Sequence, residues 1–135
     1  METWKESQLK QLTFAKGIDT AYPILLRFAE NLGFNFCAVT VALPQQVTSL
    51  NALKINNYPE EWNTQYEQKK FSSIDTVIAH CNQSMMPIVW NETLYAKAPH
   101  VWQALQQQGL QHGWSQSFHH KESGLCSILS LARKH

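Results

Sequence analysis

The residues of this 135-residue chain that could do chemistry are concentrated between Asn57 and Trp90. Tyr58, Trp62 and Tyr66 follow one another at intervals of four, so in a helix they line one side. Such a stripe is compatible with ordinary core packing. Each of the three side chains, however, ends in a polar group that needs a hydrogen-bond partner once it is buried. The stripe is therefore a candidate lining for a site as well as a candidate core.

Asp75 lies in the segment that adjoins this stripe, beside the apolar Ile74 and Val77. Three roles are compatible with its position. It could be exposed, or it could cap a helix, although Ser72 and Ser73 lie nearer the expected helix start. It could also be a carboxylate held in an apolar aromatic pocket, which is costly unless some group donates a hydrogen bond to it. A ligand amide N–H is one such donor.

Other groupings of reactive residues favour no second site. His119 and His120 are adjacent, and adjacent strand residues point to opposite faces, so the pair is poorly placed to share a metal ion. Cys81 has no partner at the spacing of zinc ligands. The sequence GWSQS at 113–117 lacks the final glycine of a nucleophile elbow. We therefore expect no metal site, no cofactor and no serine nucleophile.

The elements that must position these residues are predicted from apolar periodicity and from turn residues. The predicted helices cover residues 2–15, about 20–32, 59–70, 72–83 and 98–108. The predicted strands cover residues 34–43, 51–56, 86–90, 114–119 and 125–133. Asp19 or Thr20 is expected to cap the second helix, with Pro23 in its first turn and Gly33 at its end. This order predicts an α+β fold, an α-β-α sandwich with a central five-stranded antiparallel sheet.

Composition limits the class of protein. Residues 1–135 are expected to form one domain, with 44% hydrophobic and only 16% charged residues. The net charge of +1 lacks the basic excess of a nucleic-acid-binding protein. There is no apolar run long enough to span a membrane and no signal segment, which predicts a cytoplasmic protein. The isolated Cys37, Cys81 and Cys126 indicate reduced, packed thiols.

The segment from Asn56 to Trp90, NNYPEEWNTQYEQKKFSSIDTVIAHCNQSMMPIVW, resembles the acyl-homoserine-lactone-binding domain of LuxR-type quorum-sensing regulators. The shared pattern is Tyr-Pro, then Trp, Tyr, an aromatic residue, Asp-Pro and Pro-x-x-Trp. The similarity extends from about Leu32 to Arg133. Two positions depart from the pattern, since Thr76 stands where the family usually has proline and Phe71 where it more often has tyrosine.

The resemblance implies a role for each polar group of the stretch. Asp75 would accept the ligand amide N–H, and Trp62 would donate its indole N–H to the lactone carbonyl. Tyr58 and Ser130 would donate to the amide carbonyl. Trp90 would pack on the lactone ring and Tyr66 would wall the acyl chain. The remaining pocket wall would comprise Ala38, Thr40, Val77, Leu110 and Ser115.

The resemblance also implies partners. Members of the family are transcription regulators that bind DNA through a C-terminal helix-turn-helix domain, which is absent from these 135 residues. We expect a non-catalytic sensor that forms a homodimer and contacts DNA only through such a domain. Two alternatives stay open: an orphan sensor or truncated modulator with a different small ligand, and a small hydrolase of lactones or amides that uses Asp75 and Tyr58 as an acid–base pair.

Overall fold

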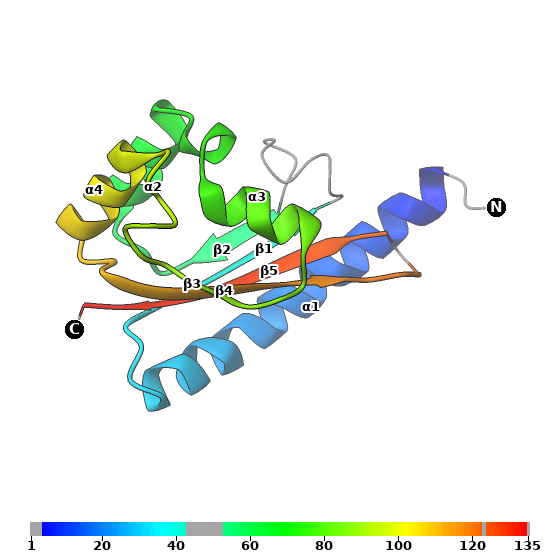
Figure 1. Ribbon diagram of the computed structural model, residues 1–135. Helices are drawn as coiled ribbons and strands as arrows, with labels where there is room; N and C mark the ends of the chain where they lie inside the picture. The colour runs from blue at the N-terminus through cyan, green and yellow to red at the C-terminus, as the bar shows by residue number, and fades with distance from the viewer. Residues whose placement is uncertain (1–3, 43–52, 123, 135) are drawn as a thin grey trace.

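Five antiparallel strands form one sheet in the computed structural model, which describes residues 4–42, 53–122 and 124–134 (Figure 1). The strand order across the sheet is β2-β1-β5-β4-β3. The strands are β1 Phe36–Ala42, β2 Leu53–Asn56, β3 Ile88–Val89, β4 His112–His119 and β5 Cys126–Arg133. Every neighbouring pair is antiparallel, as predicted.

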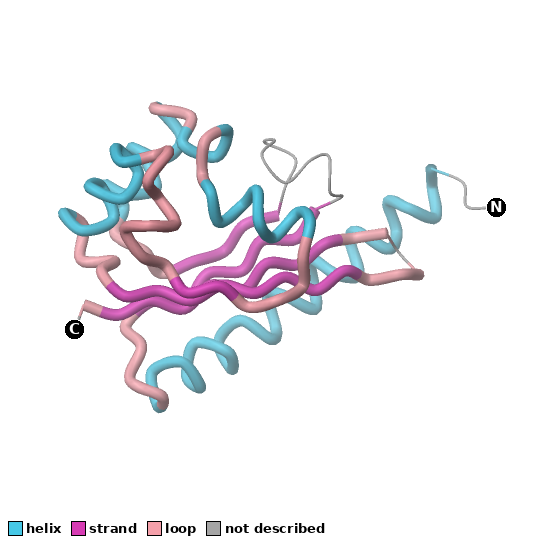
Figure 2. The backbone as a smooth tube through the Cα atoms, viewed as in Figure 1, coloured by secondary structure: helices cyan, strands magenta, loops and turns pink. Residues whose placement is uncertain are grey.

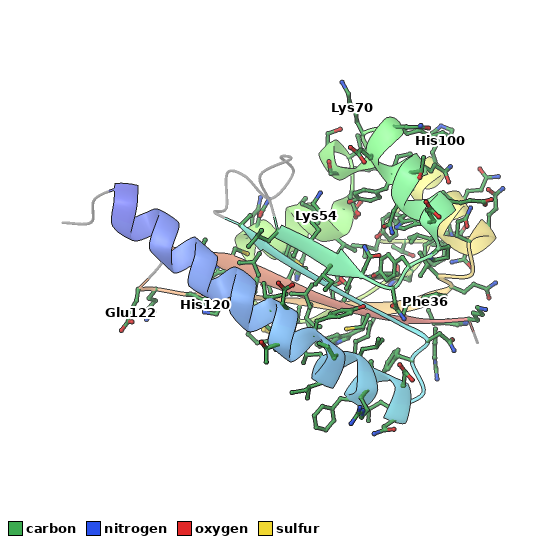
Figure 3. All side chains as sticks on the ribbon, turned by 180° about the vertical axis from the view of Figure 1, so that it is seen from behind. Phe36, Lys54, Lys70, His100, His120 and Glu122 are labelled. Carbon is green, nitrogen blue, oxygen red and sulfur yellow. The ribbon has the colours of Figure 1, made fainter. Side chains whose placement is uncertain are left out.

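Helices cover both faces of the sheet. The long helix α1 crosses one face, and three shorter helices lie over the opposite face, with the strands between the two layers (Figures 1 and 2). The helices are α1 Trp4–Asn31, α2 Glu60–Gln68, α3 Thr76–Gln83 and α4 Pro99–Gln107, with a 3₁₀ turn, η2, at Phe71–Ser73. Seen from behind, α1 lies in front of the sheet and Lys54 marks the edge strand β2 (Figure 3). The α-β-α sandwich expected from the sequence is therefore confirmed.

The N-terminal region differs from the prediction. Two helices were expected, but α1 is a single helix of 28 residues that contains Pro23 in its interior. Asp19 and Thr20 lie within this helix and do not begin a new one. Interior proline costs about 3 kcal/mol. Burial of the apolar side of α1 against the sheet offsets this cost. The residues on this side are Ile18, Tyr22, Leu25, Leu26 and Ala29.

The sheet separates two apolar cores. Cys37, Val39 and Val41 point from β1 toward α1, where they form one core. Phe36 and Ala42 belong to the other core, on the side of α2, α3 and α4. Because side chains alternate along a strand, Ala38 and Thr40 face the second side. This alternation, predicted from the sequence, places two of the expected pocket residues toward the helical layer.

One helix and one strand are shorter than predicted. The helix expected from Ser72 or Ser73 begins instead at Thr76, because Asp75 is its N-cap. The strand expected over 86–90 pairs only at Ile88 and Val89. The predicted ends at residues 2, 3, 43, 51 and 52 lie outside the described residues.

Two smaller sequence predictions concern thiols and membranes. The three cysteines are free and buried, as predicted. Over the described ranges, no helix combines the length and apolarity that crossing a membrane requires.

Candidate functional site

A cavity of about 580 Å³ lies between the sheet and the helices opposite α1. Its wall combines residues of β1, β2 and β5 with residues of α2, α3 and the segment before α4. All predicted site residues except Leu110 and Ser115 lie on this wall: Ala38, Thr40, Tyr58, Trp62, Tyr66, Asp75, Val77, Trp90 and Ser130. This volume is typical of a small-molecule pocket.

Asp75 both caps helix α3 and lines the cavity. Its Oδ1 accepts the backbone N–H of Val77 at 2.9 Å, which caps the start of α3. Tyr66 donates its hydroxyl to Oδ2 at 2.8 Å, and Tyr95 donates its hydroxyl to Oδ1 at 3.2 Å. The capping role and the pocket role, which were alternatives at the level of sequence, therefore occur together. Of these three hydrogen bonds only that of Tyr66 goes to Oδ2, and an oxygen with two lone pairs has capacity for a further donor.

The pKa of the Asp75 carboxyl is raised above its ordinary value, chiefly because burial penalises the charged form. The hydrogen bonds from Tyr66, Val77 and Tyr95 act in the opposite direction and offset part of this shift. Burial and the nearby Asp75 also raise the pKa of the Tyr66 and Tyr95 hydroxyls well above the usual range. Both phenols therefore stay protonated and remain donors toward the carboxylate.

The raised pKa of Asp75 predicts a pH dependence of folding stability. As pH rises, the unfolded chain loses this proton first, at about pH 4, while the folded chain still holds it. The contribution of Asp75 to the free energy of unfolding is therefore fully present below that pH and is lost as pH rises through the folded-state pKa. Urea unfolding of the wild type and of Asp75→Asn over pH 4–8 measures this contribution as a difference. A difference that stays constant across the range would contradict the raised pKa, and Glu92→Gln, an exposed carboxylate, is the matched control.

Trp62 lies at the centre of an aromatic cluster on the cavity wall. Its ring centroid is 5.4 Å from that of Tyr66 and 6.0 Å from that of Phe71. The three rings hold one another in place, and Phe71 supports the wall from the core without lining the cavity. Within the part of the chain that the structure describes, no group accepts a hydrogen bond from the Trp62 indole. This N–H is therefore a donor available to a guest.

A row of residues crosses the cavity face of the sheet at the level of Ser130. Strand pairing sets Asn56 beside Ala38, Ala38 beside Ser130, Ser130 beside Ser115, and Ser115 beside Ile88. Ser115 is fully buried and is not among the residues that line the cavity, so its expected contact with a ligand stays a prediction. Leu110 is likewise fully buried in the core beside the cavity and does not line it.

Trp90 is held against β4 by a close fit. Its backbone N–H donates to the carbonyl of Gly113 at 2.8 Å, and its indole N–H donates to Ser115 Oγ at 2.9 Å. Its six-membered ring occupies the space that a side chain at Gly113 would need. A glycine at this strand position is thus required by packing against the indole.

Tyr95, which bonds to Asp75, is one of the lining residues that the sequence analysis missed. It follows a turn in which Asn91 Oδ1 accepts the Leu94 N–H at 2.8 Å and the Asn91 carbonyl accepts the Tyr95 N–H at 3.2 Å. The asparagine at the start of this turn is the only local signal, and it predicts a turn without indicating where Tyr95 points. The cavity rim also includes the exposed Lys54 and Glu67, which no motif marked.

Together, the sandwich fold and the aromatic cavity around one acid are typical of a small-molecule-binding α+β domain. The family model of the autoinducer binding domain matches residues 18–135. The chain therefore belongs to the autoinducer-binding domain family of LuxR-type quorum-sensing regulators, as the resemblance predicted.

Individual relatives agree with this assignment. The chain is 29% identical over 135 residues to the transcriptional activator protein AnoR of Acinetobacter nosocomialis, covering 98% of this chain and 56% of that protein. It is 30% identical over 111 residues to the transcriptional activator protein PhzR of Pseudomonas fluorescens, covering 82% of this chain and 45% of that protein. The chain thus spans about half the length of these curated relatives.

Solved structures show the same fold. The solution structure of residues 1–171 of Escherichia coli SdiA superposes with a TM-score of 0.75 at 27% identity, covering 97% of this chain and 76% of that one. SdiA in complex with octanoyl-rac-glycerol superposes with a TM-score of 0.75 at 25% identity, covering all of this chain and 57% of that one.

Proposed function

We propose that the ligand of this autoinducer-binding domain is an N-acyl-homoserine lactone held in the cavity. The observation that carries the proposal is that one cavity wall combines the acceptor-only carboxylate of Asp75 with the indole donor of Trp62, for which the described residues provide no acceptor. An amide N–H and a lactone carbonyl complement these two groups. A guest without an acceptor for the Trp62 indole would leave that buried N–H desolvated with no partner among the described residues, which costs affinity.

Two further hydroxyl donors on the cavity wall suit the amide carbonyl. Ser130 lines the cavity from β5, and Tyr58 lines it from the segment before α2. Burial raises the pKa of the Tyr58 hydroxyl, so it stays protonated and can donate. Trp90 offers its ring face to the lactone, because its N–H is already donated to Ser115. In this arrangement every polar group of the ligand head has a partner of the right kind.

The acyl tail would lie along the apolar part of the wall. Ala38, Thr40 and Val77 line this part together with the ring of Tyr66. Each methylene removed from water contributes roughly 0.8 kcal/mol to binding. We expect these side chains to set the preferred acyl length, and Leu110 to act only by supporting the wall from the core.

A second ligand class is an acyl glycerol, which the complex of SdiA with octanoyl-rac-glycerol favours. Such a molecule shares the acyl chain but carries hydroxyl groups in place of the amide N–H. A glycerol hydroxyl can donate to the Asp75 carboxylate and accept from the Trp62 indole. Comparing the two ligands with the same eight-carbon chain isolates the contribution of the head group.

We propose that the domain is a sensor without catalytic activity and that it needs no cofactor. The carboxylate of Asp75 already accepts three hydrogen bonds, an arrangement suited to holding a ligand. The names of the relatives, which are transcriptional activators, support a role in regulating transcription in the cytoplasm, with DNA contacted by a part outside these 135 residues. The homodimer expected from the resemblance stays a prediction.

Thermal melting with and without N-octanoyl-homoserine lactone tests the proposal. A ligand that binds only the folded chain at 100 times its Kd stabilises it by about 2.7 kcal/mol, so the melting temperature should rise by several degrees. Mass spectrometry of the recovered ligand should find it intact, at one per chain. No shift at saturating lactone or octanoyl glycerol would overturn the proposed ligands, and a ring-opened or deacylated product would indicate an enzyme.

A further inference from the structure

Three polar groups form a hydrogen-bonded chain that runs from the core to the cavity. The Trp90 indole N–H donates to Ser115 Oγ at 2.9 Å, and Ser115 Oγ lies 2.6 Å from Ser130 Oγ. Ser115 and Ser130 are directly opposite each other on β4 and β5, which explains the short distance. Ser115 is fully buried, whereas Ser130 lines the cavity.

The direction of this chain follows from the chemistry of its first member. An indole N–H donates and never accepts, so Ser115 Oγ is the acceptor in its contact with Trp90. Among the described residues, Ser115 Oγ has no hydrogen-bond partner other than Trp90 and Ser130. If Ser130 donated to Ser115, the Ser115 proton would be buried without an acceptor, at the full cost of its desolvation. Ser115 therefore donates to Ser130.

Ser130 keeps its own proton to donate, because it accepts from Ser115. A side-chain hydrogen bond with Ser130 lowers the pKa of Tyr58 against the larger effect of burial, so in the free domain the Ser130 proton points to the Tyr58 oxygen. A ligand carbonyl placed between the two hydroxyls can accept from both in place of this contact. Two hydroxyl donors are thus available on one part of the wall, which suits a carbonyl oxygen that accepts two hydrogen bonds.

We propose that Ser115 is a positioning residue that makes Ser130 a hydrogen-bond donor to the ligand carbonyl, although Ser115 itself never touches the ligand. This inference rests on the proposed function. It fixes the direction of each hydrogen bond: Trp90 donates to Ser115, Ser115 donates to Ser130, and Ser130 donates to the ligand. Without the Ser115 hydroxyl, the Ser130 proton is free to rotate away from the ligand, and the orientation must be fixed at the moment of binding.

A double-mutant cycle on the whole 135-residue chain tests this coupling, with N-octanoyl-homoserine lactone as the probe and isothermal titration calorimetry as the measurement. Ser115→Ala and Ser130→Ala should each weaken binding by about fivefold, the value of one neutral hydrogen bond. The double variant should also be weaker by about fivefold if Ser115 acts on the ligand through Ser130 and not through its hydrogen bond to Trp90. Ser117→Ala is the matched control: Ser117 is a fully buried serine of the same strand that bonds the Ser84 carbonyl and does not line the cavity, so its loss should leave affinity within twofold.

Two results would overturn the inference while leaving the proposed function intact. One is wild-type affinity in Ser115→Ala, and the other is a double variant about 25-fold weaker, the product of the single effects. If Ser115→Ala does not fold by circular dichroism, Ser115→Cys replaces it in the cycle, because the thiol keeps nearly the same volume and is only a weak donor. Absence of lactone binding by the wild type would overturn the proposed function and this inference together.

Discussion

Replacement of Asp75 by asparagine should weaken binding of N-octanoyl-homoserine lactone by roughly 5- to 150-fold, equivalent to about 1–3 kcal/mol. The carboxylate accepts from every donor around it, whereas an amide presents N–H₂ on one side. Either the Tyr66 hydroxyl, which donates to Asp75, or the proposed ligand N–H would then face a second donor in the complex. Isothermal titration calorimetry at pH 7 measures the loss.

The same substitution should leave the folded domain intact without ligand. Asparagine is as good an N-cap as aspartate, so the hydrogen bond from Val77 and the start of α3 are preserved. Burial disfavours the ionised carboxylate, so a neutral amide should not lower the melting temperature at pH 7. Weaker binding combined with unchanged stability separates the ligand role from the capping role. Glu92→Gln makes the same chemical change at an exposed position and should alter neither quantity; unchanged affinity in Asp75→Asn would mean that Asp75 does not contact the ligand.

The part of the site that the sequence predicted well is the part encoded by local periodicity. Trp62 and Tyr66 recur at helical spacing within α2, and both reach the cavity wall; Tyr58 reaches it from the segment before the helix. Ala38 and Thr40 follow the alternation of a strand and face the same side. Periodicity fixes the face on which a side chain lies, because helix and strand geometry are local.

The burial depth of a side chain and its contacts with distant parts of the chain do not follow from local periodicity in the sequence. Ser115 lies on the same face of the sheet as Ser130 and directly beside it, but the Trp90 indole bonds to Ser115, which does not line the cavity. No local pattern in the sequence reveals this long-range contact. Tyr95 contacts Asp75 across 20 residues of chain through a turn, for which no period exists. The single helix α1 shows a third limit, since the tertiary packing of its apolar side outweighs the local effect of Pro23.

Substitution of Gly113 by alanine should both destabilise the domain and abolish high-affinity binding of the lactone. A Cβ at this position would overlap Cε3 and Cδ2 of the Trp90 indole. The backbone has little freedom to move away, because Gly113 pairs with Ala132 of β5 and accepts the Trp90 N–H at 2.8 Å. The indole must therefore shift, which costs about 1–3 kcal/mol in overpacking. A displaced ring also loses its hydrogen bond to Ser115 and its place on the cavity wall.

A double-mutant cycle with Trp90→Ala identifies this collision as the cause. In the Trp90→Ala background the indole is gone, so Gly113→Ala should cost less than about 0.5 kcal/mol in urea unfolding. Gly17→Ala is the matched control, since a Cβ there meets no atom within 4 Å and the position lies inside α1. Alanine is preferred to glycine in a helix by about 0.5–1 kcal/mol, so this variant should be more stable than the wild type. Equal destabilisation by Gly113→Ala with and without the Trp90 ring would show that the strand, and not the indole, requires glycine at this position.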